Sequence, residues 1–416
     1  MAMKSSRIAR SPNYLSWLFI SLFIVWGSTW LDRMAFFYLA PYIAPALKFD
    51  AGVIGNIGAV TGLCWALTSI VGGVLSDRVG RKVVLVPAIF LMAIASAATA
   101  LCHDQTSMLV VRGILGLAEG AIASVLFTVL AEEAPPARRA FIVGLVLSAS
   151  PLVGSGVGPI LMTQVANAFG WPAGFLVAGG PGLVFGFVLI AVMREPLRSA
   201  DRAERLGESP PRAPIVTIKR NVVLTLALGT LFVTALIPFV IFSPLYLTKV
   251  DGFTPTQMGF ILGAAGTGAF FSSFLVPLLA DRLGRRLGLF VSVAVWALVP
   301  LSFLYCGANA VLLAVVGFLC TTTQANAAIT LSVIPVESTN EKHVGAVVGG
   351  AIALGEVFGG TLSPIVAGHL ADAYGLAVPM WWSFIATVLM AIFALFLRET
   401  APGVVFSSPA RVAAAR

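Results

Sequence analysis

Long apolar segments separated by short polar ones dominate the pattern along this 416-residue chain. A helix needs about 20 mostly apolar residues to cross the hydrocarbon core of a bilayer, and each segment provides them. The glycines and prolines inside the segments are compatible with transmembrane helices, which tolerate both. The pattern predicts an all-α integral membrane protein with twelve transmembrane helices, near residues 15–46, 52–75, 83–102, 108–133, 140–166, 172–193, 221–247, 255–280, 287–306, 309–335, 344–370 and 378–398.

Composition supports this fold class. Of all residues, 58% are hydrophobic and only 11% are charged, whereas a soluble globular protein has about 25% charged residues. So few charged groups cannot cover a water-exposed surface. The composition therefore excludes a soluble globular protein.

Positively charged residues collect on one side of the predicted membrane. If the N-terminus lies on the inner side, 22 of the 26 Lys and Arg residues fall there, and only Lys48 and Lys249 fall outside. Such an excess marks the cytoplasmic side of a membrane protein. We expect a multi-pass protein of the cell inner membrane with both termini cytoplasmic and basic loops against anionic membrane lipid. No nucleic-acid partner is indicated, because no basic face lies on a folded soluble domain.

Enzyme motifs are missing from the sequence, which has no H-E-x-x-H, Walker loop or G-x-S-x-G, and no C-x-x-C spacing among its four cysteines. The run GSGVGP, from Gly154 to Pro159, resembles a nucleotide-binding loop but lies inside an apolar segment with no preceding strand. Gly154 and Gly158, four residues apart, instead predict a close contact between two helices. We expect no enzyme, no metal and no organic cofactor.

An internal repeat divides the chain. GVLSDRVGRK, residues 73–82, recurs as PLLADRLGRR at 277–286, a shift of 204 residues. Repeats of this kind build secondary transporters with a site between two halves. We expect a six-helix half at 1–193, a cytoplasmic linker at 194–220, and a second six-helix half with a short cytoplasmic tail at 221–416. One chain already closes two halves around one site, which favours a functional monomer.

The repeated G-x-x-x-D-R-x-G-R-[KR] pattern, placed after the second helix of each half, resembles the signature loop of the major facilitator superfamily. The second copy has Pro277 in place of the first glycine. The resemblance implies an inner-side latch in which Asp77 caps a helix N-terminus and pairs with a base across the interface between the halves, stabilising the outward-facing state. The gating residues that it implies are Gly73, Asp77, Arg78, Gly80, Arg81, Lys82, Asp281, Arg282 and Arg285.

Charged residues deep in the apolar segments are the candidates for chemistry. Each costs about 2.5–3.5 kcal/mol at a helix centre even on the translocon insertion scale. Such residues must pair, face a watery cavity or act in function. They are Asp32, Arg33, Arg112, Glu119 and Glu356.

The first segment offers both a cation and an acid. Trp26, Trp30, Arg33 and Phe37 share one helical face by their spacing, so Arg33 is expected to face a cavity as a carboxylate clamp, which suits a guanidinium. Asp32, one position round, is expected to face the fourth segment and Arg112. Such a buried pair can serve packing alone. Alternatively, acids near bases in a partly dry cavity have coupled proton affinities and carry protons.

A narrower resemblance comes from LDR at 31–33 and VVRGILGLAEG at 110–120. Together they resemble the anion:cation symporter family, which imports sugar acids and other organic anions with protons. The resemblance implies that Asp32 and Glu119 are protonation sites and that Arg33 binds the substrate carboxylate. Arg112 pairs with an acid, and protonation of both acids frees the two arginines for the anion.

The same motifs also resemble the Spinster-type lipid transporters, which share the first-helix Asp–Arg, the R-x-x-x-G-x-x-E of the fourth helix and a fifth-helix glycine pattern. Two transport functions therefore stay open. One is proton-coupled import of a small organic anion, a sugar acid or other carboxylate, by alternating access. The alternative is a proton-driven exporter of lipids or amphiphilic drugs. A sensor without transport is a third reading, which the intact first loop disfavours.

The second half has no counterpart of the charged set, since the 204-residue shift places uncharged residues at those positions. Its candidates are Gln324 and Asn326, whose amides can bind a hydroxylated substrate or join helices. Glu356 is a further titrating group or a cavity acid, and its charge would repel a second carboxylate. Trp65 and Ser150 are candidates for the cavity wall, with packing as the alternative.

Overall fold

The computed structural model describes residues 13–135, 138–195, 218–339 and 341–401. Within them, twelve helices are long and apolar enough to cross a membrane, which confirms the predicted number. They span Tyr14–Leu47, Ala51–Val79, Arg81–Thr99, Gln105–Glu133, Phe141–Phe169, Trp171–Val192, Lys219–Lys249, Pro255–Leu283, Arg285–Tyr305, Ala310–Ser338, Ala346–Tyr374 and Ala377–Leu395. Much of the predicted linker, 196–217, lies outside the described residues.

Helix ends extend farther than apolarity alone predicts. The second helix continues through polar residues to Val79, and the eighth continues to Leu283, because backbone hydrogen bonding does not require apolar side chains. Each stops at a glycine with positive φ, Gly80 at 113° and Gly284 at 98°. Only glycine adopts such a conformation readily, so the two repeated loops turn at equivalent glycines.

Within the described residues, eight helical elements form the N-terminal half (the N-half) and eleven form the C-terminal half (the C-half). Three spans are interrupted by π-helical turns, a feature frequent at functional sites. The elements of the N-half are α1 (Tyr14–Leu47), α2 (Ala51–Val79), α3 (Arg81–Thr99), α4 (Gln105–Glu133), α5 (Arg139–Leu147), η2 (Ser150–Val157), α6 (Gly158–Phe169) and α7 (Trp171–Val192). Those of the C-half are α9 (Lys219–Lys249), α10 (Pro255–Leu283), α11 (Arg285–Tyr305), α12 (Ala310–Cys320), α13 (Thr323–Ala328), η3 (Ile329–Val333), α14 (Ile334–Ser338), α15 (Glu341–Leu354), η4 (Gly355–Leu362), α16 (Ser363–Tyr374) and α17 (Ala377–Leu395).

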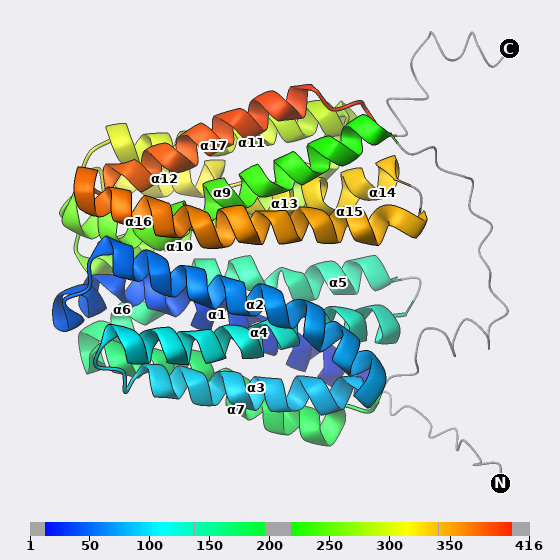
Figure 1. The fold of residues 1–416 in the computed structure, drawn as a ribbon, viewed down its shortest axis with the longest axis horizontal. Helices are drawn as coiled ribbons and strands as arrows, with labels where there is room; N and C mark the ends of the chain where they lie inside the picture. The colour runs from blue at the N-terminus through cyan, green and yellow to red at the C-terminus, as the bar shows by residue number, and fades with distance from the viewer. Residues whose placement is uncertain (1–12, 136–137, 196–217, 340, 402–416) are drawn as a thin grey trace, which may run out of the picture.

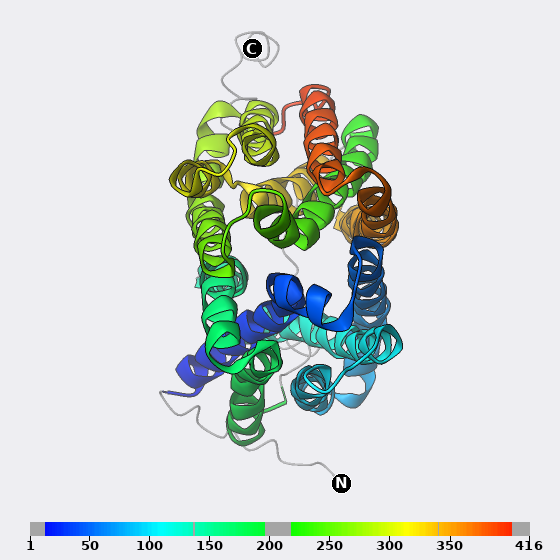
Figure 2. The same cartoon turned by 90° about the vertical axis from the view of Figure 1, so that its left-hand side faces the viewer.

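The two halves lie side by side, α1–α7 on one side of the molecule and α9–α17 on the other (Figures 1 and 2). We call the end where α1 begins and α17 ends the terminal face, at the right in Figure 1. The other end, where α1 meets α2 and α16 meets α17, is the opposite face. The interface between the halves runs from one face to the other.

The glycine-rich run of the fifth span lies inside a helix, in η2 and the start of α6, as predicted. A Cβ atom added to Gly154 would lie 2.8 Å from Cβ of Trp30, and one on Gly158 would lie 3.0 Å from Leu31. Both contacts are with α1. The predicted close helix contact is therefore confirmed, and it fixes the face of α1 that carries the charged residues.

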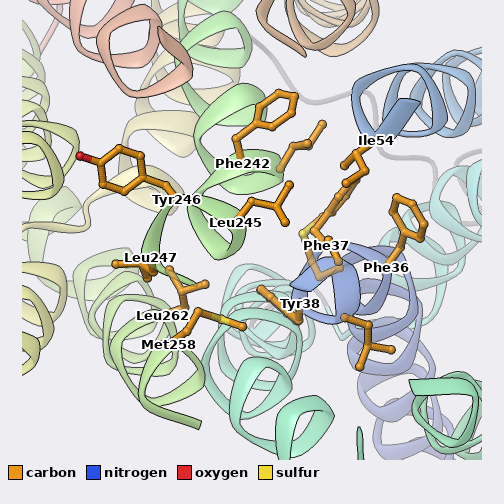
Figure 3. Packing of buried hydrophobic residues seen from close by; sticks show 14 of the residues in the cluster. Phe36, Phe37, Tyr38, Ile54, Phe242, Leu245, Tyr246, Leu247, Met258 and Leu262 are labelled. Carbon is orange, nitrogen blue, oxygen red and sulfur yellow. The ribbon is translucent and has the colours of Figure 1, made fainter. Parts of the chain in front are cut away.

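One hydrophobic cluster joins the halves near the opposite face. It combines Phe37 of α1 and Ile54 of α2 with Phe242 of α9 and Met258 of α10 (Figure 3). Toward the terminal face, the described residues form two separate clusters, one within the N-half and one within the C-half. In the part of the chain that the structure describes, the hydrophobic core thus joins the halves near the opposite face and not near the terminal face.

Hydrogen bonds reinforce the closed opposite face. The carboxylate of Asp372 in α16 accepts from the backbone N–H groups of Ala51 at 2.9 Å and Gly52 at 2.8 Å, at the start of α2. On the other flank, the amide of Asn167 donates to Thr256 at 2.9 Å. A carboxylate at a helix N-terminus is favoured by the helix dipole. The structure is therefore a conformation closed at the opposite face.

Candidate functional site

A buried polar network links α1 to α3 and α4. Asp32 is fully buried, and its Oδ1 accepts a hydrogen bond from Ser96 at 2.8 Å and lies 3.8 Å from Nη1 of Arg112. Arg112 also donates to the backbone carbonyl oxygens of Asp32 at 3.3 Å and Arg33 at 3.0 Å. The predicted proximity of Asp32 and Arg112 is confirmed. Arg112 is buried against α1 and the ring of Phe36, so its guanidinium does not line the cavity in this conformation.

Arg33 points to the interface between the halves. Its guanidinium carbon lies 5.0 Å from the ring centroid of Trp65 and 5.7 Å from that of Trp30. Among the described residues, no ion pair joins Arg33 to a carboxylate. It borders a void of about 20 Å³ whose walls come from α1, α2, α9 and η4, enough space for about one water molecule. Arg33 is thus a cation held by aromatic faces and available to an anion.

Glu119 of α4 is fully buried, and neither of its carboxylate oxygens has a hydrogen-bond partner among the described residues. The charges of Arg33, Asp32 and Arg112 all act on it. Burial of an ionised carboxylate without a partner is costly. Binding a proton would remove that cost, so the geometry suits a group that loads and releases a proton.

A larger cavity of about 110 Å³ lies beside the small void, between the halves. Both spaces share Met34, Ile237 and Val240 as wall residues. Polar wall groups of the larger cavity come from both halves and are Tyr38, Ser155, Ser243, Thr321, Thr323 and Gln324. Gln324, one of the two predicted amides, lines this cavity, and its binding of a substrate stays a prediction.

Two of the predicted cavity residues lie elsewhere. Asn326 is fully buried, donates to Thr322 at 3.2 Å and accepts from Ser292 of α11. Its amide joins helices, which is the alternative that the sequence left open. Ser150 is buried at the start of η2 and is not among the residues that line either space. Trp65 reaches the site through its ring contact with Arg33.

Glu356 lies in η4 on the C-half side of the interface. Its Oε2 is buried and has no hydrogen-bond partner among the described residues. Unlike the fully buried Glu119, Glu356 is only partly buried, and Arg33 is the charged group that acts on it and favours its ionised form. The two residues come from different halves and meet near Gly62 of α2. Glu356 is therefore near the predicted substrate anchor but is not among the residues that line either space. Whether it is a titrating group or a cavity acid stays open.

The loop between α2 and α3 forms a charge network within the N-half. Arg81 pairs with Asp77 at 2.6 Å and with Glu132 at 2.9 Å. Its backbone N–H and that of Lys82 donate to Glu195. The residue that caps the N-terminus of α3 is therefore Glu195, which sequence reasoning did not single out. Asp77 forms its ion pair with Arg81 inside its own half. Its predicted roles, capping a helix N-terminus and pairing across the interface, stay predictions for the outward-facing state.

The second loop repeats this arrangement in the C-half. Arg285 pairs with Asp281 and, at 3.0 Å, with Glu337. Its backbone N–H donates at 2.7 Å to Glu399, which stands 204 residues after Glu195. Applying the repeat shift to every acid would have identified this pair of capping glutamates. The other predicted loop residues are in place: Gly73, Arg78 and Arg282 lie in the last turns of α2 and α10, and Lys82 donates to the carbonyl oxygen of Ile190 at 2.6 Å.

Comparison with known proteins decides the family. The model of the Major Facilitator Superfamily matches residues 18–349 and 251–415. This chain belongs to the Major Facilitator Superfamily. The transporter is 28% identical over 378 residues to the hexuronate transporter of Bacillus subtilis (strain 168), covering 85% of the chain and 87% of the relative. It is 29% identical over 281 residues to the 3-(3-hydroxy-phenyl)propionate transporter of Escherichia coli (strain K12), covering 67% and 68%.

A solved structure shares the fold of the transporter. It is a bacterial homolog of the human lysosomal transporter Spinster in an inward-facing and unoccupied conformation, with a TM-score of 0.72, 16% identity, and coverage of 93% of this chain and 97% of that chain. Together these findings confirm the major facilitator fold and a transporter rather than an enzyme. They also make it a multi-pass membrane protein.

Sequence reasoning missed several residues of the site. Ser96 holds Asp32, and Tyr38 and Ser155 line the larger cavity. A serine or tyrosine inside an apolar segment is common and has no distinctive spacing. The only available signal was position, since Tyr38 and Trp30 lie close to the charged pair in α1.

Proposed function

We propose that this transporter imports a small organic anion, a sugar acid or another carboxylate, together with protons, by alternating access. The observation that carries the proposal is Arg33, a guanidinium at the interface of the halves with aromatic rings around it and no ion pair among the described residues. A planar guanidinium matches a carboxylate with two parallel hydrogen bonds. Hexuronate and 3-(3-hydroxy-phenyl)propionate, after which two relatives are named, each carry a carboxylate. These relatives support the same class of substrate for this transporter.

We assign the binding and release of the coupled protons to the carboxyl groups of Asp32 and Glu119. Both carboxyl groups are fully buried near arginines, and Glu119 lacks hydrogen-bond partners among the described residues. Protonation of Asp32 would weaken its attraction to Arg112, and protonation of Glu119 would reduce the negative field that acts on Arg33. The guanidinium of Arg33 would then attract the substrate anion more strongly. Loading of protons would in this way favour loading of substrate.

The cavity size supports a small cargo. The larger space measures about 110 Å³, well below the 300–1,000 Å³ of pockets that enclose drug-sized ligands. Gln324, Thr321 and Thr323 offer hydrogen bonds to hydroxyl groups of a sugar acid. The carboxylate would lie toward Arg33 and the hydroxylated body toward the C-half.

Orientation follows from the basic residues. We assign the terminal face to the cytoplasm, because the excess of Lys and Arg in loops marks that side. The conformation closed at the opposite face is then inward-facing. In this assignment the transporter lies in the cell inner membrane and has cytoplasmic termini. We further propose that it acts as a monomer. Its proposed organisation is a half at 1–193, a linker at 194–220 and a half at 221–416.

Proton-driven flux in proteoliposomes tests the function. A panel of sugar acids and aromatic monocarboxylates is offered outside, and the lumenal pH is followed. We expect anion-dependent acidification of the lumen by the wild type. Arg33→Ala should reduce it about 30-fold or more, since truncating one partner of a buried charge pair costs about 2–5 kcal/mol. Asp32→Asn and Glu119→Gln should uncouple proton movement from anion uptake.

Arg220→Ala is the matched control, because this exposed arginine at the start of α9 lies outside the site. It should keep wild-type flux. Lumenal pH that does not respond to any carboxylate, in a preparation that is folded by size-exclusion chromatography, would exclude the import of organic anions.

Export of lipids or amphiphilic drugs is the second candidate. It is favoured by the apolar part of the cavity wall, which includes Met34, Phe239, Leu262 and Trp296. Proton flux in the same proteoliposomes distinguishes this export from the import of organic anions. Proton movement driven by a lipophilic cation or a lysolipid, and not by carboxylates, would identify the exporter.

A further inference from the structure

We propose that Glu356 is an internal anion that competes with the substrate carboxylate for Arg33, so that the site accepts anions with one carboxylate and rejects those with two. This inference rests on the proposed function. It adds a specificity-determining residue from the C-half to a site whose other charged groups all come from the N-half.

The position of Gly62 shows how close the two groups are. A Cβ atom built on this glycine of α2 would lie 3.8 Å from Oε2 of Glu356 and 3.9 Å from Nη2 of Arg33. The two charged atoms therefore cannot be farther apart than the sum of these distances. They are too far for an ion pair in this conformation, yet close enough for their charges to interact.

Glycines on both sides of the interface create this approach. The Cβ position of Gly62 lies 3.3 Å from the carbonyl oxygen of Gly360, so α2 and η4 are nearly in backbone contact. Gly360 stands one turn after Glu356, and the carboxylate lies directly over it. A side chain at either glycine would separate Glu356 from Arg33. The packing of the halves thus sets the distance between the two charges.

The other acids of the site are placed differently. Asp32 is held by Ser96 and faces Arg112. Glu119 acts on Arg33 from α4, within the same half. Of the charged groups on the described elements around Glu356, Arg33 is the one that acts on it. Glu356 is consequently the acid whose distance to Arg33 depends on how the halves are placed.

Competition for one guanidinium has a consequence for selectivity. An entering carboxylate that binds Arg33 lies within a few ångströms of the Glu356 carboxylate. A second negative group on the same ligand finds no described cation besides Arg33 on the wall of either space and meets a like charge. Specificity often rests on such repulsion of the wrong ligand. The Glu356 carboxylate repels the single negative charge of a monoanion and both negative charges of a dianion.

Equilibrium binding to the purified full-length transporter tests the proposal. The probes are D-glucuronate, with one carboxylate, and D-glucarate, which has the same carbon chain with a carboxylate at each end. Binding is followed by tryptophan fluorescence, since Trp30 and Trp65 flank Arg33. For the wild type we expect glucuronate to bind at least about tenfold more tightly than glucarate, because like charges brought together at a binding site are strongly disfavoured.

Glu356→Gln keeps the shape of the side chain and removes its charge. We expect it to tighten glucuronate binding several-fold and to reduce the preference for glucuronate over glucarate by about tenfold or more. Glu356→Asp should keep the wild-type preference, and Glu356→Ala should resemble Glu356→Gln. Asp251→Asn is the control, because it removes a negative charge from the loop between α9 and α10, outside the cavity.

The outcomes separate this inference from the proposed function. If the wild type binds glucuronate and loses binding in Arg33→Ala, while Glu356→Gln changes neither affinity nor preference, Glu356 does not compete and this inference is wrong. Binding of neither acid by the wild type or by Glu356→Gln would reject both proposals for sugar acids. Binding of glucarate by Glu356→Gln alone would support the inference directly.

Discussion

Arg112 holds the backbone of Arg33: its Nη2 donates a hydrogen bond to the main-chain carbonyl oxygen of Arg33 at 3.0 Å. A second bond, at 3.3 Å, goes to the carbonyl oxygen of Asp32. One arginine of α4 therefore positions the segment of α1 that presents the other. Arg112 thus positions the backbone of α1, whereas Arg33 is the cation proposed to bind the anion.

Loss of Arg112 should destabilise the N-half. Arg112→Met would leave the buried Asp32 without a cation, and removal of one partner of a buried pair costs about 3–5 kcal/mol. We expect a lower thermal unfolding temperature in detergent. The double variant Asp32→Asn with Arg112→Met should recover part of the loss, because no uncompensated charge remains. Strictly additive effects of the two substitutions would contradict this coupling.

Removal of the two capping glutamates should have similar effects in the two halves. Glu195 accepts from the N–H groups at the start of α3, and Glu399 accepts from those at the start of α11. A helix cap is worth about 0.5–2 kcal/mol, and the helix dipole adds to it. Glu195→Ala and Glu399→Ala should each lower the thermal unfolding temperature by comparable amounts. A large effect of one and none of the other would show that the repeated loops are not equivalent.

Alanine at Gly154 should disrupt the contact between η2 and α1. The new Cβ would lie 2.8 Å from Cβ of Trp30 and 3.2 Å from its backbone carbon, and overpacking of this kind costs about 1–3 kcal/mol. Transport should fall as well, because Trp30 flanks Arg33. Gly144→Ala is the matched control in the same span, since nothing lies within 4 Å of its Cβ position. It should be neutral or stabilising by up to about 1 kcal/mol. Equal losses of stability in the two variants would refute the close-contact explanation.

Opening of the opposite face should become easier without Asp372. Its carboxylate binds two N–H groups of α2, and these bonds join the halves. For a partly exposed group we expect Asp372→Ala to shift the conformational equilibrium about threefold to tenfold toward an open opposite face. Double electron–electron resonance between spin labels at the exposed positions Phe169 and Tyr374 measures the change, in a background without native cysteines.

Asn167→Ala provides the comparison for this measurement. It removes the neutral hydrogen bond to Thr256 on the other flank of the interface, and neutral bonds are weaker than those to charged groups. Its shift should therefore be smaller than that of Asp372→Ala. An unchanged distance distribution in Asp372→Ala would show that the bonds of Asp372 do not contribute to closing this face.

The sequence by itself determined the features that depend on local composition and on repetition. Twelve apolar segments of sufficient length are spans in lipid wherever they pack, because each helix satisfies its own backbone hydrogen bonds. The repeat of 204 residues placed the two loops, and the charges in α1 and α4 indicated the candidate site. The proximity of Asp32 to Arg112 also followed from sequence reasoning, since charges in lipid require partners.

Only the tertiary structure decided how the helices are rotated and which ends of the halves meet. Arg33 and Glu356 are 323 positions apart, and nothing in either segment indicates that two glycines bring them together. Asn326 and Gln324 are two positions apart in one helix, yet one joins helices and the other faces the cavity. Glu195 caps α3 although it lies 114 positions from Arg81, because a cap is defined by its position in space. These distinctions depend on packing between distant segments, which local patterns do not encode.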